Sequence, residues 1–493
     1  MRAVATATRN RAARCGALLL AASLAVCGCA TNPATGATSL TGFTSVASET
    51  QEGADQNPAV LAAFGGAYAD ATLAAYVNEV GQRVAAGSER AGISYKFQVL
   101  DTPIVNALAI PGGYIYVTRG LLAIVNSEAE LAGVLGHEIG HVAAMHHAQG
   151  QMRETIAQVG MLPLAIVAPL LMGAPQLAAQ SFLRSFSRDA EYEADTLGIR
   201  YVSRAGYDPA ATASFLVSMR SYEQVQALID GRAPGSVDQF DYMATHPNAL
   251  ERYRRALAEA KQAMPANPIV RRREYLAMLD GAIFGASPDQ GFIRGRIFAH
   301  PKLRFRFEVP SGFEMFDTAN AVYAASPDDA MIIFDGAPET SGITMTGYIR
   351  QVWAKGVPVS EVRRGEVNGL EAATAIASAT TKRGPITMRI VAIRMDASHI
   401  YRFRFIAPAK SAPALAPAFA KTTASFRKLS VAEAAALKPR RIKIFAVAIG
   451  DTVSTLAARS AFDNYPQEQF RAINGLAPAL ESIPLQQVKM VVE

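Results

Sequence analysis

The 493-residue chain is too long for one domain, so we expect several. The chain has 48 Lys and Arg residues and 42 Asp and Glu residues, and four of the arginines lie in the first 14 positions. Without those four, the net charge is close to zero and gives no support for nucleic acid as a partner. All three cysteines lie within the first 29 residues, so the rest of the chain has no thiol for a disulfide or a metal site.

The first 28 residues have the pattern of an export signal. Four arginines accompany an apolar stretch, Gly16 to Val26, that is too short to span a bilayer. The next residues resemble a lipobox in which Cys29 is the lipidated residue. Cys27 as the lipidated residue and an ordinary secretory signal peptide are the alternatives. We therefore expect residues 1–28 to form a lipoprotein signal peptide.

The residue after the lipidated cysteine bears on the location of the protein. This residue is Ala30 and not Asp, and in this respect the chain resembles lipoproteins destined for the outer membrane. We therefore expect the protein in the periplasm, anchored to the outer membrane through its N-terminal lipid, with a soluble periplasmic protein as the alternative. Residues 29–56 are rich in Ser, Thr, Gly and Ala, and we expect them to form a flexible tether.

Residues 57–285 are predicted to form a mainly helical domain with a small sheet. Apolar residues alternate from Phe97 to Thr118 on both sides of Pro111-Gly112-Gly113, a pattern typical of two strands joined by a tight turn. Proteins that bind extended peptides often do so at such an exposed sheet edge, through main-chain hydrogen bonds. An ordinary hairpin packed in the sheet is the alternative for each residue of this segment.

The string His137-Glu138-Ile139-Gly140-His141 follows on a predicted helix that begins with the capping pair Ser127 and Glu130. Residues four apart lie on one helix face, so His137 and His141 can both bind a single Zn²⁺ at about 2.0–2.1 Å. Glu138 lies beside that face, where its carboxylate can take a proton from water that the metal activates.

A second pair of residues at helical spacing follows fifty positions later. Glu191 and Asp195 are four apart on a predicted helix, so their carboxylates point from one face. One of them can serve as the third zinc ligand while the other accepts a hydrogen bond from a ligand histidine. An acidic run of this kind is otherwise a solvated helix face.

Together, the segments 105–114, 137–141 and 191–195 resemble the HtpX- and BepA-like zinc metalloproteases, which are gluzincins related to the CAAX prenyl proteases. The resemblance covers roughly residues 32–260. It implies one zinc ion per chain held by His137, His141 and Glu191, with Glu138 as the general base and Asp195 supporting a ligand histidine.

The same resemblance extends to three further parts of the site. It implies that Asn106 and Ala107 form the substrate-facing edge of the sheet. His246, which precedes a proline, matches a family histidine that can occupy the fourth zinc position and hold the enzyme latent. The donor for the developing oxyanion is either His246 or Arg252, and the sequence does not choose between them.

Two smaller units are expected after the protease domain. Residues 291–430 alternate polar and apolar residues like the strands of an antiparallel α+β domain, resemble PsbP-like modules and contain no catalytic constellation. We interpret the arginines interleaved in these strands as the solvated side of a sheet. Residues 438–493 resemble a LysM module, with the order strand, helix, helix, strand, which implies binding to glycans such as peptidoglycan. Residues 451–454 and 474–476 would line its groove, although Leu485-Gln486-Gln487 departs from the family pattern.

The overall expectation is a multidomain α+β protein that acts as a lipid-anchored periplasmic zinc metalloendopeptidase. Its substrates would be misfolded or stalled envelope proteins. The first alternative is a largely latent, chaperone-like outer-membrane assembly factor, and the second is a cell-wall-binding protein that uses the LysM-like module.

Overall fold

A computed structural model describes most of the chain. The described ranges are 29–40, 45–150, 186–235, 249–318, 321–338, 342–381 and 384–493. The expected signal peptide, residues 1–28, and His246 lie outside these residues. Within the described ranges, no helix combines the length and the apolar character needed to cross a bilayer.

The expected flexible tether over residues 29–56 is wrong for most of its length. Strands β1 (Cys29–Thr31) and β2 (Thr38–Leu40) form an antiparallel hairpin, and helix α2 (Val46–Ala63) follows. The helix begins with a capping box in which Ser45 and Ser48 satisfy each other's backbone N–H groups. Its Gly53 packs against the carbonyl oxygen of Pro111, where a Cβ atom would lie only 2.0 Å away.

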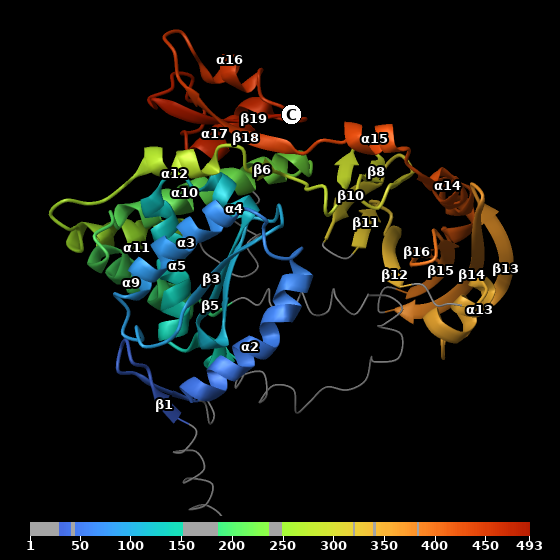
Figure 1. Cartoon of the computed structure of the whole chain (residues 1–493), viewed down its shortest axis with the longest axis horizontal. Coiled ribbons are helices and arrows are strands. Elements are labelled where there is room, and N and C mark those ends of the chain that lie inside the picture. Colours follow the sequence, from blue (N-terminus) through green and yellow to red (C-terminus); the bar gives the residue numbers. More distant parts are fainter. Residues whose placement is uncertain are drawn as a thin grey trace, which may run out of the picture.

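The next part of the chain is mainly helical and carries a three-stranded sheet. Its strands are β3 (Lys96–Leu100), β4 (Ala107–Ile110) and β5 (Tyr114–Thr118), in the order β3-β5-β4. Strands β4 and β5 form the expected hairpin around residues 111–113, and β4 lies at an edge of the sheet. The surrounding helices, shown in Figure 1, are α3 (Ala71–Ala85), α4 (Arg119–Ile124), α5 (Glu128–Ala143), α9 (Arg188–Arg204), α10 (Ala210–Ile229), α11 (Ala249–Gln262) and α12 (Arg272–Leu279).

Helix α5 lies at the centre of this domain, and all of its residues are buried. Glycines on its surface bring it close to its neighbours. A Cβ atom on Gly140 would lie 2.8 Å from the carbonyl oxygen of Ala194, and one on Gly136 would lie 3.1 Å from that of Gly198. Helices α5 and α9 therefore pack at a short distance that larger side chains would prevent.

The following segment forms two antiparallel sheets (Figure 1). One has the order β17-β9-β8-β7, with β7 (Phe292–Arg294), β8 (Ile297–His300), β9 (Phe305–Glu308) and β17 (Arg427–Lys428). The other has the order β10-β11-β12-β16-β15-β14-β13, with β10 (Glu314–Asp317), β11 (Ala321–Ala325), β12 (Met331–Pro338), β13 (Ser360–Val367), β14 (Leu370–Thr381), β15 (Gly384–Arg394) and β16 (His399–Pro408).

Helices cover the two faces of the larger sheet. Helix α14 (Ala412–Ser425) packs on the face that is rich in phenylalanine, and α13 (Met345–Tyr348) packs on the other. The interpretation of the interleaved arginines as solvated is wrong for Arg404, which is 2% exposed and pairs with Asp335 on β12. Arg402 pairs with the same carboxylate, so Asp335 interacts with both guanidinium groups inside the domain.

The chain ends in the expected order of strand, helix, helix, strand: β18 (Arg440–Ala446), α16 (Val453–Ala457), α17 (Pro466–Asn474) and β19 (Gln487–Val492). We call residues 440–492 the C-terminal module. Strand β18 pairs with β19 and also with β6 (Ile283–Phe284), so the sheet includes residues from the end of the helical domain. The short helix α15 (Val431–Ala436) precedes the module.

The C-terminal module is docked on the helical domain just before helix α5. Lys489 of β19 is fully buried, and its Nζ donates to the carbonyl oxygens of Ala123 and Val125, each at 2.8 Å. Gly475 lies against Asn126, so one of the two segments expected to line a glycan groove faces the helical domain. In the other segment, residues 451–454, Val453 is buried and the other three residues are half-buried.

Candidate metal centre

Three side chains from two helices converge at the crossing of α5 and α9. The Nε2 atoms of His137 and His141 are 3.0 Å apart, and they lie 3.5 and 3.4 Å from the two carboxylate oxygens of Glu191. Ligand atoms around a tetrahedral Zn²⁺ at about 2.1 Å lie roughly 3.4 Å from one another. All three residues are buried. The predicted set of His137, His141 and Glu191 therefore fits a zinc ion in donor type and in spacing.

Asp195 lies one turn after Glu191, as the helical spacing predicts, and its Oδ1 atom is 2.9 Å from Nδ1 of His137. A carboxylate in this position fixes the ring orientation and leaves Nε2 directed at the metal. Burial raises the pKa of Asp195, whereas the neighbouring Arg252 guanidinium and the hydrogen bond to His137 lower it. The lowering effects are together larger, so the pKa lies well below its usual value. Asp195 is therefore ionised.

Arg252 of α11 is oriented differently from the oxyanion donor that the sequence suggested. Its Nε and one terminal nitrogen contact the two oxygens of Asp195 at 2.7 and 2.8 Å, and the other terminal nitrogen is 2.9 Å from Glu191. Every guanidinium nitrogen thus contacts a carboxylate. Burial lowers the pKa of Arg252, whereas Asp195, Glu191 and Glu138 raise it above its ordinary value.

The two histidines have opposite electrostatic surroundings. Burial holds the pKa of His141 well below its usual value, so this ring is neutral and can present a lone pair. Burial and Arg252 lower the pKa of His137, but the hydrogen bonds to Asp195 and Glu191 raise it to about 9. A metal that binds here must therefore displace a proton from His137.

Glu138 follows His137 on α5 and is 2% exposed. Its carboxylate is near enough to Arg252 to contribute to the raised pKa of that guanidinium. A carboxylate that is buried beside a metal-binding group is suited to accept a proton from water.

Asn106 and Ala107, at the start of the edge strand, are each 4% exposed. The Oδ1 atom of Asn106 is buried and has no hydrogen-bond partner among the residues that the structure describes. The backbone N–H of Thr118 donates to the carbonyl oxygen of Asn106. In the antiparallel pairing of β4 with β5, residues 106, 108 and 110 therefore form the hydrogen-bonded pairs with β5. The backbone groups of Ala107 and Ala109 therefore point away from β5, toward the free edge.

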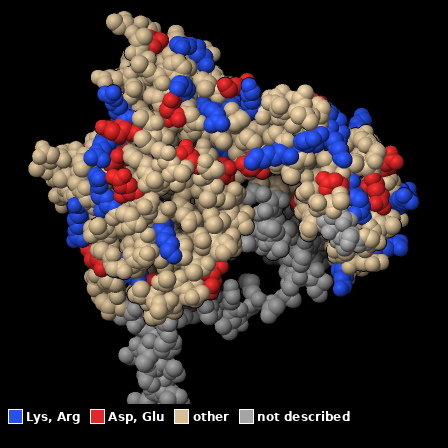
Figure 2. All heavy atoms as spheres, in the orientation of Figure 1, with Lys and Arg blue, Asp and Glu red and all other residues tan. Residues whose placement is uncertain are grey.

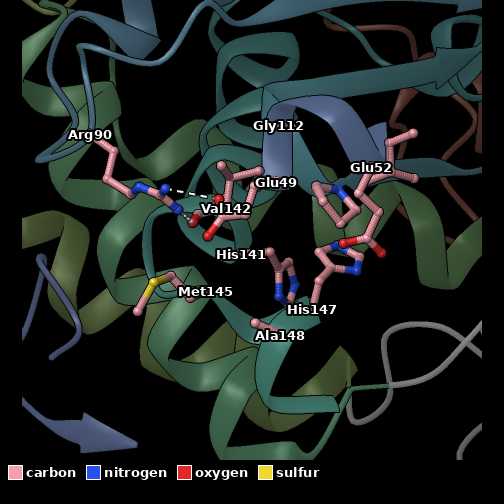
Figure 3. Close-up of a pocket in the computed structure, with 11 residues that line it drawn as sticks. Glu49, Glu52, Arg90, Gly112, His141, Val142, Met145, His147 and Ala148 are labelled. Carbon is pink, nitrogen blue, oxygen red and sulfur yellow. Dashed lines mark hydrogen bonds and ion pairs between the residues drawn. The ribbon is translucent and has the colours of Figure 1, made fainter. Parts of the chain in front are cut away.

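A pocket beside His141 runs along the end of this edge strand (Figure 3). Helix α2 contributes Glu49 and Glu52 to its wall, and Gly112 comes from the turn after β4. Arg90 closes one side, where it contacts Glu49 at 2.8 Å and donates to the carbonyl oxygen of Val142 at 3.0 Å. The N-terminal helix, which the sequence assigned to a tether, is thus part of the site.

Two aromatic residues near His141 were not identified from the sequence. The ring of Phe186 stacks on that of His141, with centroids 4.0 Å apart and an interplanar angle of 21°. His146 lies 2.8 Å from Nδ1 of His141 through its own Nδ1. Neither residue is at helical spacing from the metal-binding motif, although an additional histidine five positions later was a usable signal in a chain with seven histidines.

Charged side chains of both signs lie on the face of the molecule that Figure 2 shows. Figure 2 shows basic and acidic residues interspersed over the visible face. On this face the mixture of signs matches the near-neutral balance of the sequence.

Comparison with known proteins gives a family match over the same region. Residues 71–260 match the model of Peptidase family M48, which covers α3, the sheet, α5 and α9. A mitochondrial metalloendopeptidase OMA1 from Arabidopsis thaliana is 38% identical over 169 residues, which are 34% of this chain and 32% of that protein.

Bacterial relatives match over a similar length. Beta-barrel assembly-enhancing proteases from Yersinia pestis and Escherichia coli are each 29% identical, over 42% and 40% of this chain and 43% and 40% of their own. The chain thus spans less than half of the length of these relatives. Among solved structures, a cyanobacterial PsbP from Synechocystis is similar over 28% of this chain and 98% of its own, at 11% identity. Its TM-score of 0.23 is too low to support any argument.

Proposed function

We propose that this chain, which carries a Peptidase family M48 domain in residues 71–260, is a zinc-dependent endopeptidase. The observation that carries the proposal is the convergence of His137, His141 and Glu191 within the spacing of a tetrahedral zinc site. Zinc, when bound there, would polarise a water molecule and the scissile carbonyl.

The residues of the chain then have separate roles in peptide hydrolysis. Glu138 accepts the proton of the attacking water and returns it to the leaving amine, as a general base and then a general acid. Asp195 orients His137 through its Nδ1 atom, and Arg252 holds the carboxylates of Asp195 and Glu191 in place. An oxyanion donor is also required, and His246 is our candidate for it.

The substrate is proposed to bind as an extended strand along β4. The backbone N–H and C=O groups of Ala107 and Ala109 face the free edge and can pair with a peptide backbone. Pairing of this kind would use main-chain groups more than side chains. This mode of binding favours unfolded or extended protein segments and imposes little sequence preference.

We propose misfolded or stalled envelope proteins as the substrates, in line with the printed names of the bacterial relatives. The lipobox-like sequence supports anchoring to the outer membrane in the periplasm through Cys29. Peptidoglycan is the weaker candidate as a partner of the C-terminal module, because the 474–476 segment packs on the helical domain.

Removal of the metal should abolish cleavage of a denatured protein such as casein, and stoichiometric Zn²⁺ should restore it. The Glu191→Ala variant should bind zinc at least about 100-fold more weakly, because it lacks one of three protein ligands. Casein cleavage rates measure the first effect and zinc content after dialysis against defined free zinc measures the second, with Glu79→Gln on the exposed face of α3 as the control. A purified wild-type protein without stoichiometric zinc, or cleavage that is insensitive to chelators, would reject the proposal.

A further inference from the structure

A chain of contacts leads from the metal centre to the N-terminal hairpin. Nδ1 of His141 is 2.8 Å from Nδ1 of His146, whose Nε2 is 3.2 Å from Oε2 of Glu193. The other oxygen of Glu193 accepts a hydrogen bond of 2.7 Å from Nδ2 of Asn32. His141 and His146 are buried, so water does not replace these contacts easily.

If His141 is a metal ligand, the donor and the acceptor of each hydrogen bond in this chain of contacts are determined. Its Nε2 atom faces the other ligands and must carry the lone pair, which leaves the proton on Nδ1. Nδ1 then donates to Nδ1 of His146, and Nε2 of His146 donates to the carboxylate of Glu193. Each ring donates once and accepts once, as a neutral imidazole requires.

The far end of the chain of contacts is held by a well-defined turn. Asn32 is 2% exposed, and its Oδ1 atom accepts from the backbone N–H groups of Ala34 and Thr35. Its backbone closes the β1–β2 hairpin, with Asn32 N–H donating to Ala37 at 2.7 Å. This geometry fixes the side-chain amide so that Nδ2 points at Glu193.

We infer that His146 and Glu193, held by Asn32, are positioning residues that set the tautomer and the ring orientation of the ligand His141. The inference rests on the proposed zinc site. The two ligand histidines then have different supports: His137 is oriented by Asp195 within the helix pair, whereas His141 depends on residues that reach the N-terminal hairpin.

The simplest competing explanation is that His146 only fills space beneath Phe186, whose ring centroid lies 5.9 Å away. Leucine would then replace it without effect on the metal. Glutamine separates the two explanations, because its carbonyl oxygen can accept from His141 while its amide donates to Glu193.

Zinc affinity of the full chain, measured by competition with a chromophoric chelator, tests the inference. Loss of a group that orients a ligand weakens metal binding by about 10- to 100-fold, which we expect for His146→Leu. His146→Gln should recover most of the wild-type affinity. Glu193→Ala and Asn32→Leu act further from the metal and should each weaken binding by about three- to tenfold.

The visible spectrum of the Co²⁺-substituted protein gives a second readout. It should change in His146→Leu and return toward that of the wild type in His146→Gln, whereas hydrogen exchange of the metal-free protein should be similar in all variants. Asp189→Asn, an exposed position on the same helix as Glu193, is the matched control.

The outcomes separate this inference from the proposed function. If the wild-type protein binds no zinc, the proposed function fails. If the wild type binds zinc and His146→Leu and Glu193→Ala bind it equally well, only the positioning role is overturned. Glu193 is partly exposed, so its variant is expected to fold even if His146→Leu does not.

Discussion

Replacement of Glu138 by glutamine is expected to lower kcat for peptide hydrolysis by about 100- to 10,000-fold, the range typical of a lost general acid–base group. Glutamine has nearly the same shape as glutamate and can occupy the same buried position on α5. It has no basic oxygen, however, so it cannot accept the proton of the attacking water. Initial rates of casein cleavage at saturating zinc measure the effect.

The same variant should keep its metal and its fold, because Glu138 is not one of the three metal-binding side chains. Zinc content and thermal unfolding are therefore measured in parallel, with Glu79→Gln as a charge-matched control on α3. Metal-dependent cleavage at the wild-type rate by Glu138→Gln would show that another group takes the proton.

The metal centre was predictable because helical spacing is a local property. His137 and His141, and again Glu191 and Asp195, are four residues apart, and the structure has each pair on one helix face. The two pairs form one site because segments about fifty residues apart come into contact. Helical periodicity gives no information about such long-range contacts. The family resemblance supplied that link, and the small residues at the crossing of α5 and α9 provide its physical basis.

The supports of the ligands were not predictable in the same way. His146 and Glu193 contact each other only because α5 and α9 cross, and Asn32 reaches Glu193 from 161 positions earlier in the chain. A sequence pattern cannot indicate which of many polar side chains will meet across such distances. Arg252 was identified, but its three contacts with carboxylates became evident only from the packing of α11 on α9.

Composition misled the sequence analysis at the N-terminus. Residues 29–56 are rich in small polar residues, which suggested a tether, but Ser45 and Ser48 form a capping box and the following residues include good helix formers. Helix α2 is then stabilised by tertiary contacts, such as that of Gly53 with Pro111. Local capping signals were therefore more informative here than the average composition.

The C-terminal module illustrates the limit of domain boundaries drawn from sequence. Its order of strands and helices was predicted, whereas its attachment was not. The side-chain nitrogen of Lys489 donates to carbonyl oxygens at the end of α4, only a few residues before the helix that bears His137. Glu130 of α5 lies close enough to interact with this side chain. The module thus supports the region from which the metal-binding helix begins.

Arg252→Met is expected to destabilise the metal-free helical domain by about 3–5 kcal/mol, the cost of removing one partner from a buried ion pair. Methionine fills a similar volume but removes the guanidinium, so that protonated His137 alone is left to compensate the buried carboxylates of Asp195 and Glu191. The loss should be local to the contacts between α9 and α11. Arg254→Met, at an exposed position on the same helix, should have little effect.

Hydrogen exchange is the appropriate measurement, because Trp353, the single tryptophan, lies in the sheet domain and does not report on these helices. A change of 3–5 kcal/mol corresponds to about a hundred- to several-thousandfold faster exchange for amides that open with the domain. Zinc should reverse part of the loss, because a bound cation again compensates the charge of Glu191. Wild-type protection of α9 in the metal-free Arg252→Met variant would mean that the ion pairs do not hold this crossing together.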